Sequence, residues 1–417
     1  MDKVVKNFTP NGSIRVPSSK SYSHRYLITA FIYNRPVTIT NINMCDDVIA
    51  TIECLKTLGA TFEIYKNTVK FIKRDVKPGP IELNVGASGS TLRMLFPLAI
   101  YLYKDVKFVG KASLFNRPMG VYKEILEKQK ISYEVGEGFI HVKGNLKPTD
   151  FEVKADISSQ FISGLLFFNV LTNSKKKLKI IPPIESKFYI VMTLNVLEEM
   201  GFLYENKSNV YRFIGKVKNN NTVFDTEVDY SLLANMAVCA TLKGSVELFI
   251  NSITSLQGDS IILDFLSTIG AYIKYKDNAI VVTHHNLVPF DVNISDCIDL
   301  GPVLFVLASL IPGRTHFSGI RRLQYKESNR IASMVNELKK TGVEIEVSEN
   351  DLYIKGKEKI TGDYEFETYN DHRIAMALTI LGMNIDGKVV IKGAECVDKS
   401  YPHFYEDLES LRGWTFY

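Results

Sequence analysis

A pattern of apolar residues at helical spacing, followed by glycine and then by alternating apolar residues, recurs along the chain. In its first copy, apolar side chains from Val48 to Leu58 occupy one helical face, and Gly59 follows. A glycine after the last turn typically adopts the left-handed conformation that ends a helix. The alternation from Phe62 to Phe71 then predicts a hairpin.

The pattern repeats at a spacing of about 70 residues. Its later copies end at Gly201, Gly270, Gly342 and Gly413. The first interval, from Gly59 to Gly201, is twice as long as the others, so the spacing predicts a further copy near Lys130, with lysine in place of glycine. A second series of helices opens with small polar or acidic residues at the same spacing. These residues are Ser21, Ser90, Ser159, Ser231, Asp299 and Asp371. Together the two series predict six copies, each with two helices and several strands.

Composition narrows the class of protein. The chain has 417 residues, is 46% hydrophobic and carries a formal net charge of +4, which is typical of a soluble globular protein and too small to suggest a nucleic-acid partner. Its five cysteines show neither CxxC nor Cys/His spacing, so neither a disulfide framework nor a zinc site is indicated and a reducing cytoplasm is expected. The longest apolar stretch, near Gly301–Pro312, is too short to cross a membrane.

The starts of the second helices carry hydroxyl, glycine and arginine residues. Examples are Lys20-Ser21 with Arg25, Ser88-Gly89-Ser90 and Asp371-His372-Arg373. Helix N-termini expose unpaired N–H groups at the positive end of the helix dipole. The sequence therefore predicts a set of anion-binding helix ends.

At these segments the chain resembles the enolpyruvyl transferases, and among them the branch that acts on shikimate 3-phosphate. The resemblance runs from Gly12 to about Leu408. The matching segments are Pro17–Arg25, Ser88–Arg93, Arg117–Met119, Ser158–Phe161, Ser186–Tyr189, Lys326–Arg330, Asn370–Arg373 and Lys399.

The resemblance implies an α/β fold of two domains, each built from three repeated β/α units as in an inverse α/β barrel. Helix N-termini would face the cleft between the domains. One domain would comprise residues 1–14 and 228–417, and the other residues 15–227.

The resemblance also implies an activity and its residues. The enolpyruvyl group of phosphoenolpyruvate would pass to the 5-hydroxyl of shikimate 3-phosphate, with release of phosphate and without a metal or organic cofactor. Asp299, Glu327 and Lys20 would be catalytic. Contacts to shikimate 3-phosphate would come from Lys20, Ser21, Arg25, Ser158, Ser159, Gln160, Ser186, Asp299 and Lys326. Contacts to phosphoenolpyruvate would come from Lys20, Gly89, Arg117, Gln160, Arg330, Arg373 and Lys399.

Charge and spacing refine this site. The spacing of Lys326 and Arg330 predicts that both lie on one face of a helix, while Glu327 points away from that face. An anion bound between the two cations would relieve their repulsion. The seven cationic side chains among these residues, together with the carboxylates Asp299 and Glu327, give a net charge of 7 − 2 = +5. This charge is close in size and opposite in sign to that of two substrates that each carry a phosphate and a carboxylate. The chain departs from the family pattern at Ala87, where asparagine or an acidic residue is usual, and at Arg322, where asparagine is common.

Three alternatives stay open. A transferase that acts on UDP-N-acetylglucosamine would carry a reactive cysteine before an Arg-Pro pair, and no cysteine lies between Gly110 and Pro118. An RNA-end-processing protein would need a basic, aromatic-rich surface. A non-catalytic anion-binding repeat protein would leave Asp299 and Glu327 idle. We expect a monomeric cytoplasmic enzyme with small-molecule substrates and neither nucleic-acid nor membrane partners.

Overall fold

The computed structural model describes residues 1–155 and 158–412, and these form two compact units. One unit combines Met1–Pro17 with the chain from Glu227 onward, and the other is Ser18–Thr226. The chain passes from one unit to the other twice, after Pro17 and after Thr226. Gly413, which the sequence predicts to end the last copy, lies outside the described residues.

In the unit Ser18–Thr226 the same sheet is built three times. Each sheet begins with a parallel pair of strands and continues with an antiparallel hairpin. The first sheet has the order β14 (Val223–Asp225), β3 (Val37–Thr40), β5 (Thr68–Arg74), β4 (Ala60–Tyr65). The second has β6 (Ile81–Gly86), β7 (Asp105–Gly110), β9 (Phe139–Lys143), β8 (Ser132–Gly136). The third has β10 (Phe151–Lys154), β11 (Lys177–Ile181), β13 (Val210–Lys216), β12 (Phe202–Lys207).

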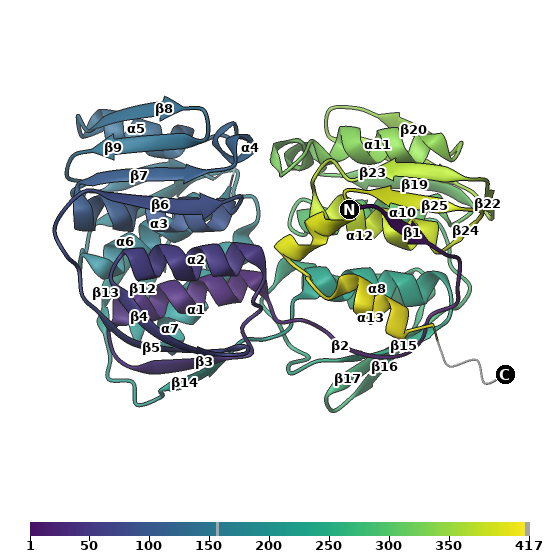
Figure 1. Cartoon of the computed structure of the whole chain (residues 1–417), viewed down its shortest axis with the longest axis horizontal. Coiled ribbons are helices and arrows are strands. Elements are labelled where there is room, and N and C mark those ends of the chain that lie inside the picture. The colour runs from purple at the N-terminus through teal and green to yellow at the C-terminus, as the bar shows by residue number, and fades with distance from the viewer. Residues whose placement is uncertain (156–157, 413–417) are drawn as a thin grey trace. The chain divides into compact units, whose positions relative to one another are not determined.

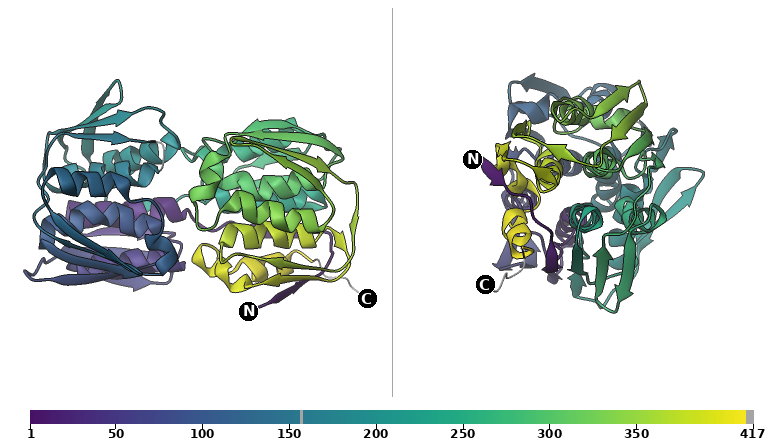
Figure 2. Two further views of the ribbon diagram at one scale, coloured as in Figure 1. Left: turned by 90° about the horizontal axis from the view of Figure 1, so that it is seen from above. Right: turned by 90° about the vertical axis from the view of Figure 1, so that its right-hand side faces the viewer.

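Two kinds of helix join these strands (Figures 1 and 2). One kind is buried on all sides along most of its length, as expected for a helix surrounded by its own domain. These interior helices are α1 (Lys20–Tyr33), α3 (Gly89–Tyr103) and α6 (Ser159–Leu171). The other kind buries one face only. It comprises α2 (Asp46–Thr57), α5 (Gly120–Lys128) and α7 (Lys187–Glu199), and a short helix α4 (Ala112–Phe115) precedes α5.

The other unit repeats this architecture. Its first sheet has the order β2 (Asn11–Arg15), β15 (Ser245–Phe249), β17 (Ala279–Thr283), β16 (Tyr272–Lys276). The second has β18 (Asp291–Asn293), β19 (Gly313–Ser318), β21 (Asp351–Gly356), β20 (Glu344–Val347). The third has three strands, β23 (Tyr364–Glu367), β25 (Val389–Lys392) and β1 (Lys3–Val5), beside the short pair β22 (Ile360–Thr361) and β24 (Ile385–Asp386).

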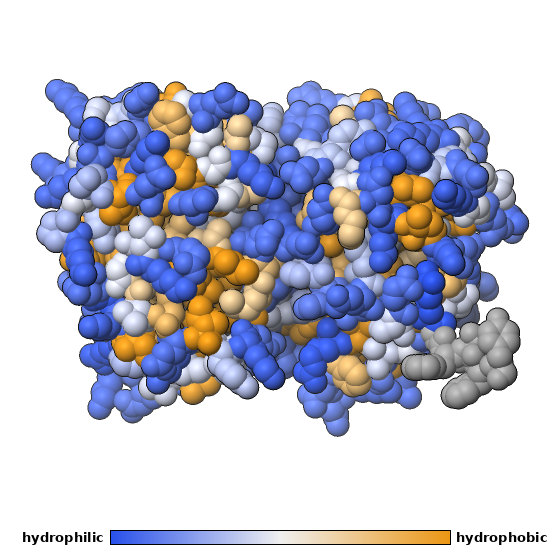
Figure 3. All heavy atoms as spheres, viewed as in Figure 1, coloured by the Kyte–Doolittle hydropathy of each residue, from blue (hydrophilic) through white to orange (hydrophobic). Residues whose placement is uncertain are grey.

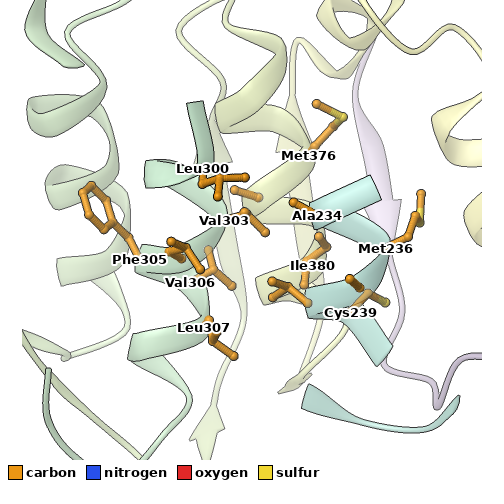
Figure 4. Close-up of a cluster of buried hydrophobic side chains, with 14 of the residues drawn as sticks. Ala234, Met236, Cys239, Leu300, Val303, Phe305, Val306, Leu307, Met376 and Ile380 are labelled. Carbon is orange, nitrogen blue, oxygen red and sulfur yellow. The ribbon is translucent and has the colours of Figure 1, made fainter. Parts of the chain in front are cut away.

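Three interior helices again form the centre of this unit. They are α8 (Tyr230–Leu242), α10 (Gly301–Ser309) and α12 (His372–Gly382). Figure 4 shows their side chains meeting, with Ala234 from α8, Val303 from α10 and Ile380 from α12. The outer helices are α9 (Ile262–Thr268), α11 (Arg330–Lys340) and α13 (Phe404–Ser410), and 3₁₀ turns are η1 (Gly258–Ile261), η2 (Ile298–Leu300), η3 (Arg321–Tyr325) and η4 (Ala394–Lys399).

The six predicted copies are therefore present as three repeated β/α units in each half of the chain. The glycines that end the outer helices have positive φ, including Gly59 at 100°. A Cβ at Gly59 would lie 2.2 Å from the carbonyl oxygen of Asp75, so a side chain is excluded there. Lys130 also has positive φ, at 56°, which confirms the copy that spacing alone located.

The face of the protein drawn in Figure 3 is mostly hydrophilic. Apolar side chains that remain exposed lie on strands, such as Tyr65 and Tyr272, and also on helices and loops. Among the described residues, the helices are all too short or too polar to span a lipid bilayer.

Candidate active site

Five of the six interior helices begin with a side-chain cap, and α10 does not. Ser19, Ser88, Ser158, Asp229 and Asp371 each accept a hydrogen bond from a backbone N–H of the first turn. Of the residues predicted to open these helices, Asp371 is a cap, and Ser21, Ser90, Ser159 and Ser231 lie in the first turn. Asp299 differs, because it lies in the 3₁₀ turn η2 before α10.

Lys20, at the start of α1, is held by an acidic residue of the neighbouring helix. Its Nζ lies 2.9 Å from Oδ2 of Asp47, in the first turn of α2, and both side chains are largely buried. The carboxylate fixes the ammonium group at the helix end and offsets its charge. Asp47 was not among the predicted site residues.

Arg25 is buried within the same unit. Its guanidinium donates to Oγ1 of Thr193 and to the carbonyl oxygens of Ser21 and Tyr189, at 2.8–2.9 Å, and to Oγ of Ser163 at 3.4 Å. Burial lowers the pKa of Arg25 to about 10. Four of its five N–H groups have protein acceptors, so among the described residues at most one N–H is left for a ligand.

Gly89, in the first turn of α3, lies among three polar side chains. A Cβ built at Gly89 would lie 3.3 Å from Nη1 of Arg117 and 3.6 Å from both Nη1 of Arg93 and Oε1 of Gln160. Arg93 donates to Oε1 of Gln160 at 3.0 Å, and Nε2 of Gln160 donates to Oγ of Ser90 at 2.9 Å. The structure thus brings Gly89, Arg117 and Gln160 together, and adds Arg93 and Ser90.

The side chains around Gly89 carry positive charge, and none of the described carboxylates forms an ion pair with them. In the described chain, Nε of Arg93 and Nε of Arg117 are buried without hydrogen-bond acceptors, and neither guanidinium forms an ion pair. Burial, followed by the charge of Arg117, lowers the pKa of Arg93 to about 10. Two adjacent guanidinium groups without a counterion are a chemically suitable site for a phosphate or carboxylate.

The remaining predicted residues of this unit lie at the starts of α6 and α7. Oγ of Ser158 accepts from the backbone N–H of Gln160 at 3.3 Å, and Ser159 is buried in the first turn. Ser186 is buried in a left-handed conformation, with φ of 54°, directly before α7. Each hydroxyl therefore lies at a helix N-terminus.

In the other unit, Asp299 is surrounded by three cations. Its Oδ1 lies 3.1 Å from Nζ of Lys326 and 2.8 Å from Nη1 of Arg330, and its Oδ2 lies 3.5 Å from Nη2 of Arg373. Burial raises the pKa of Asp299, but Arg373, Lys326 and Arg330 outweigh burial and hold it well below its ordinary value. Asp299 is therefore ionised at neutral pH.

The prediction that Lys326 and Arg330 share a helix face is wrong. Lys326 is extended at the end of η3, and α11 begins only at Arg330 because the side chain of Asn329 caps it by accepting from the N–H of Ala332. The two cations nonetheless meet, since both contact Oδ1 of Asp299. A carboxylate of the protein, supplied by η2, thus lies where the sequence predicted a bound anion.

Glu327 forms the second carboxylate centre. Its Oε1 lies 3.1 Å from Nζ of Lys399, and its Oε2 lies 2.9 Å from Nδ1 of the buried His372. The neighbouring Asp371 accepts from Nε of Arg330 at 2.8 Å and from Nη2 at 3.1 Å. Glu327, Asp371 and His372 have the donor atoms of a metal site, but an incoming cation would have to displace Lys399 and Arg330.

The ion pairs change the charge expected from sequence. Asp47 neutralises Lys20, and Asp371 shares Arg330 with Asp299. With these two carboxylates the total becomes 7 − 4 = +3, not +5. Both were missed because each pairs with a residue at least 27 positions away.

Solved structures of enolpyruvyl transferases resemble this chain over its length. EPSP synthase from Acinetobacter baumannii superposes with a TM-score of 0.78 at 24% identity, covering 98% of each chain. The enolpyruvyl transferase NikO from Streptomyces tendae superposes with a TM-score of 0.74 at 14% identity, covering 98% of this chain and 97% of that one. At such identities the likeness shows the fold, which is that of the enolpyruvyl transferases.

Sequence comparisons narrow this class. The family model for EPSP synthase (3-phosphoshikimate 1-carboxyvinyltransferase) matches residues 7–408. Relatives with the name 3-phosphoshikimate 1-carboxyvinyltransferase are 38% identical in Clostridium kluyveri (96% of this chain, 95% of the relative) and 36% identical in Clostridioides difficile (97% and 95%). The chain belongs to the EPSP synthase family of enzymes.

Proposed function

We propose that this enzyme transfers the enolpyruvyl group of phosphoenolpyruvate to the 5-hydroxyl of shikimate 3-phosphate, as a step of aromatic amino acid biosynthesis. Membership of the EPSP synthase family over residues 7–408 supports the reaction. The observation that carries the mechanism is the pair of carboxylates Asp299 and Glu327, each in contact with side chains suited to bind anions.

Asp299 is the proposed acceptor of the hydroxyl proton. In the structure its basicity is held down by Lys326, Arg330 and Arg373. Anionic substrates that bind these cations would weaken their hold on Asp299 and raise its proton affinity. The base would therefore become effective when the substrates are present.

We assign the proton transfers at phosphoenolpyruvate to Glu327 and Lys20. The hydroxyl oxygen bonds to C2 of phosphoenolpyruvate while C3 takes up a proton, which gives a tetrahedral intermediate. C3 then loses a proton and the C2–O bond to phosphate breaks, releasing phosphate and forming the product. Contact of Glu327 with Lys399 and His372 gives it routes for proton exchange.

The binding residues are divided between the two units. We propose that Lys20, Ser21, Arg25, Ser158, Ser159, Gln160, Ser186, Asp299 and Lys326 bind shikimate 3-phosphate. We propose that Lys20, Gly89, Arg117, Gln160, Arg330, Arg373 and Lys399 bind phosphoenolpyruvate. If both units contribute, Ser159→Ala in one and Lys326→Met in the other should each weaken shikimate 3-phosphate binding in calorimetry.

The test of the reaction is release of phosphate from phosphoenolpyruvate. It should require shikimate 3-phosphate, and UDP-N-acetylglucosamine should not replace it. A product of the expected mass, seen by mass spectrometry, distinguishes transfer from hydrolysis. Equal turnover with both acceptors, or none with either, would refute the proposal.

We further propose that the enzyme is a cytoplasmic monomer. Among the described residues the structure contains no disulfide bond, as suits a reducing compartment. Light scattering coupled to size exclusion should give the mass of one chain, 47.1 kDa, and a mass of two chains would refute the monomer.

A further inference from the structure

Asp259 is a buried carboxyl group outside the predicted site. It lies in η1 and is only 4% exposed. The hydroxyl of Ser231, in the first turn of α8, donates to its Oδ2. Among the described residues no lysine, arginine or histidine forms an ion pair with Asp259, although carboxylates buried this deeply are normally paired.

Its surroundings connect it to the site of Asp299. The turn η1 packs against η2, which carries Asp299, and against α8. The titratable groups that influence Asp259 are Asp299, Arg373 of α12 and Asp229 at the cap of α8, and Asp259 in turn influences the thiol of Cys297. Burial, followed by the charge of Asp299, raises the pKa of Asp259 to about 7, against the opposing influences of Arg373 and Ser231.

We propose that Asp259 is a positioning residue for phosphoenolpyruvate binding. When the Asp259 carboxyl group is neutral, the positive charge of Arg373 interacts with Asp299 and the substrate. When the carboxyl group is ionised, it competes with the substrate for that charge. The proposal rests on the proposed function, because it takes Arg373 as a ligand of phosphoenolpyruvate. Asp259 acts through Arg373 and Asp299 and does not itself contact the substrate.

The direction of the pH effect follows from the sign of the charges. As pH rises through about 7, Asp259 loses its proton and adds a negative charge that acts on Arg373. An anionic substrate is then bound less tightly, so KM for phosphoenolpyruvate rises. Asp259→Asn stays neutral at every pH and keeps a side chain that accepts a hydrogen bond from Ser231. In this variant, the rise in KM that is caused by ionisation of Asp259 should be absent.

The experiment compares KM for phosphoenolpyruvate between about pH 6 and pH 8.5 in the wild-type enzyme and Asp259→Asn. The phosphate of the substrate also titrates, but equally for both enzymes. The wild-type KM should rise roughly 3–10-fold more than that of the variant, since one pKa unit of interaction is tenfold in binding. Asp264→Asn, an exposed residue on the adjacent α9, is the matched control and should follow the wild type.

Ser231→Ala provides a second variant, which acts in the same direction as Asp259→Asn but leaves the carboxyl group in place. Its hydroxyl favours the ionised form of Asp259, so its loss should move the rise in KM to higher pH. A merely structural role for Ser231 would lower the unfolding temperature without moving this profile.

Infrared difference spectra provide a readout independent of activity. Wild type minus Asp259→Asn should contain the carbonyl band of a protonated carboxyl group that disappears as pH rises through about 7. An active enzyme whose variant has the wild-type pH profile, without this band, would overturn the role of Asp259 and leave the reaction intact. Failure of phosphate release with shikimate 3-phosphate would overturn the proposed function instead.

Discussion

Nζ of Lys326 lies 3.1 Å from Oδ1 of Asp299, and each residue shifts the proton affinity of the other. Burial lowers the pKa of Lys326 to about 8, while Asp299 acts in the opposite direction. Asp299 is in turn kept ionised by Lys326 and its two arginine neighbours. The carboxylate is therefore the unprotonated member of the pair at neutral pH.

Replacing Asp299 by alanine should lower turnover by roughly 10²–10⁴-fold, the usual contribution of a general base. Shikimate 3-phosphate binding, measured by calorimetry, should stay close to wild type because Lys326 and the other proposed contacts to this substrate remain. Asp291→Ala, at an exposed position on β18, is the control and should leave turnover unchanged. Near-normal turnover of Asp299→Ala would exclude its role as the base.

Glu327→Gln keeps the size of the side chain and removes its charge. Its contacts with Lys399 and His372 weaken, so proton exchange at phosphoenolpyruvate should slow and turnover should fall roughly 10²–10⁴-fold. Glu346→Gln, which breaks an exposed pair with Arg314, is a matched control expected to lose less than about 1 kcal/mol of stability and no activity. Equal turnover of the two variants would contradict this assignment.

Gly89→Ala should weaken phosphoenolpyruvate binding while leaving the fold intact. The new Cβ would lie 3.3 Å from Nη1 of Arg117 and would occupy the space where Arg117, Arg93 and Gln160 converge. We expect KM for phosphoenolpyruvate to rise roughly tenfold or more, about 1.4 kcal/mol, and KM for shikimate 3-phosphate to change less. Gly120→Ala, with no atom within 4 Å of its new Cβ, is the control. An unchanged KM for phosphoenolpyruvate would show that the Gly89 cluster does not bind it.

The stability of the ligand-free protein should depend on Asp259. Because its folded pKa, about 7, lies above its ordinary value of 3.8, the folded state binds the extra proton between these values. The free energy of unfolding should therefore fall as pH rises through this range, by up to about 1.4 kcal/mol per pH unit. Asp259→Asn should lack this decline in urea denaturation at successive pH values. Parallel curves for both proteins would contradict the shift.

The repeat could be predicted from sequence because its signals are local. Lys130 shows this well, since its positive φ follows from the spacing of glycines at equivalent positions. The helix face of Lys326 and Arg330 could not be predicted correctly, because Asn329 caps α11 and starts it four residues later than the charge pattern indicates. Local charge spacing and a capping residue compete here, and the cap prevails.

The pairing of charges lay beyond local reasoning. Lys20 meets Asp47, and Arg330 meets both Asp299 and Asp371, because the fold brings the starts of the outer helices α2 and α11 beside the starts of interior helices of the same unit. Asp259 gave no signal in sequence for the same reason. Its influence depends on burial and on the packing of η1 against η2, which residue order does not encode directly.

The N-terminal strands have a consequence for the order of folding. β2 completes a sheet by pairing with β15, and β1 pairs with β25, which lies nearly 400 residues further along the chain. On the ribosome, these strands emerge before their partners and must wait until the rest of their unit has been synthesised. The unit Ser18–Thr226 has its whole chain available earlier, since β14 closes its sheet at the end of the segment. Until β25 and β15 have been synthesised, β1 and β2 are exposed strand segments without partners, and they offer a chaperone binding targets.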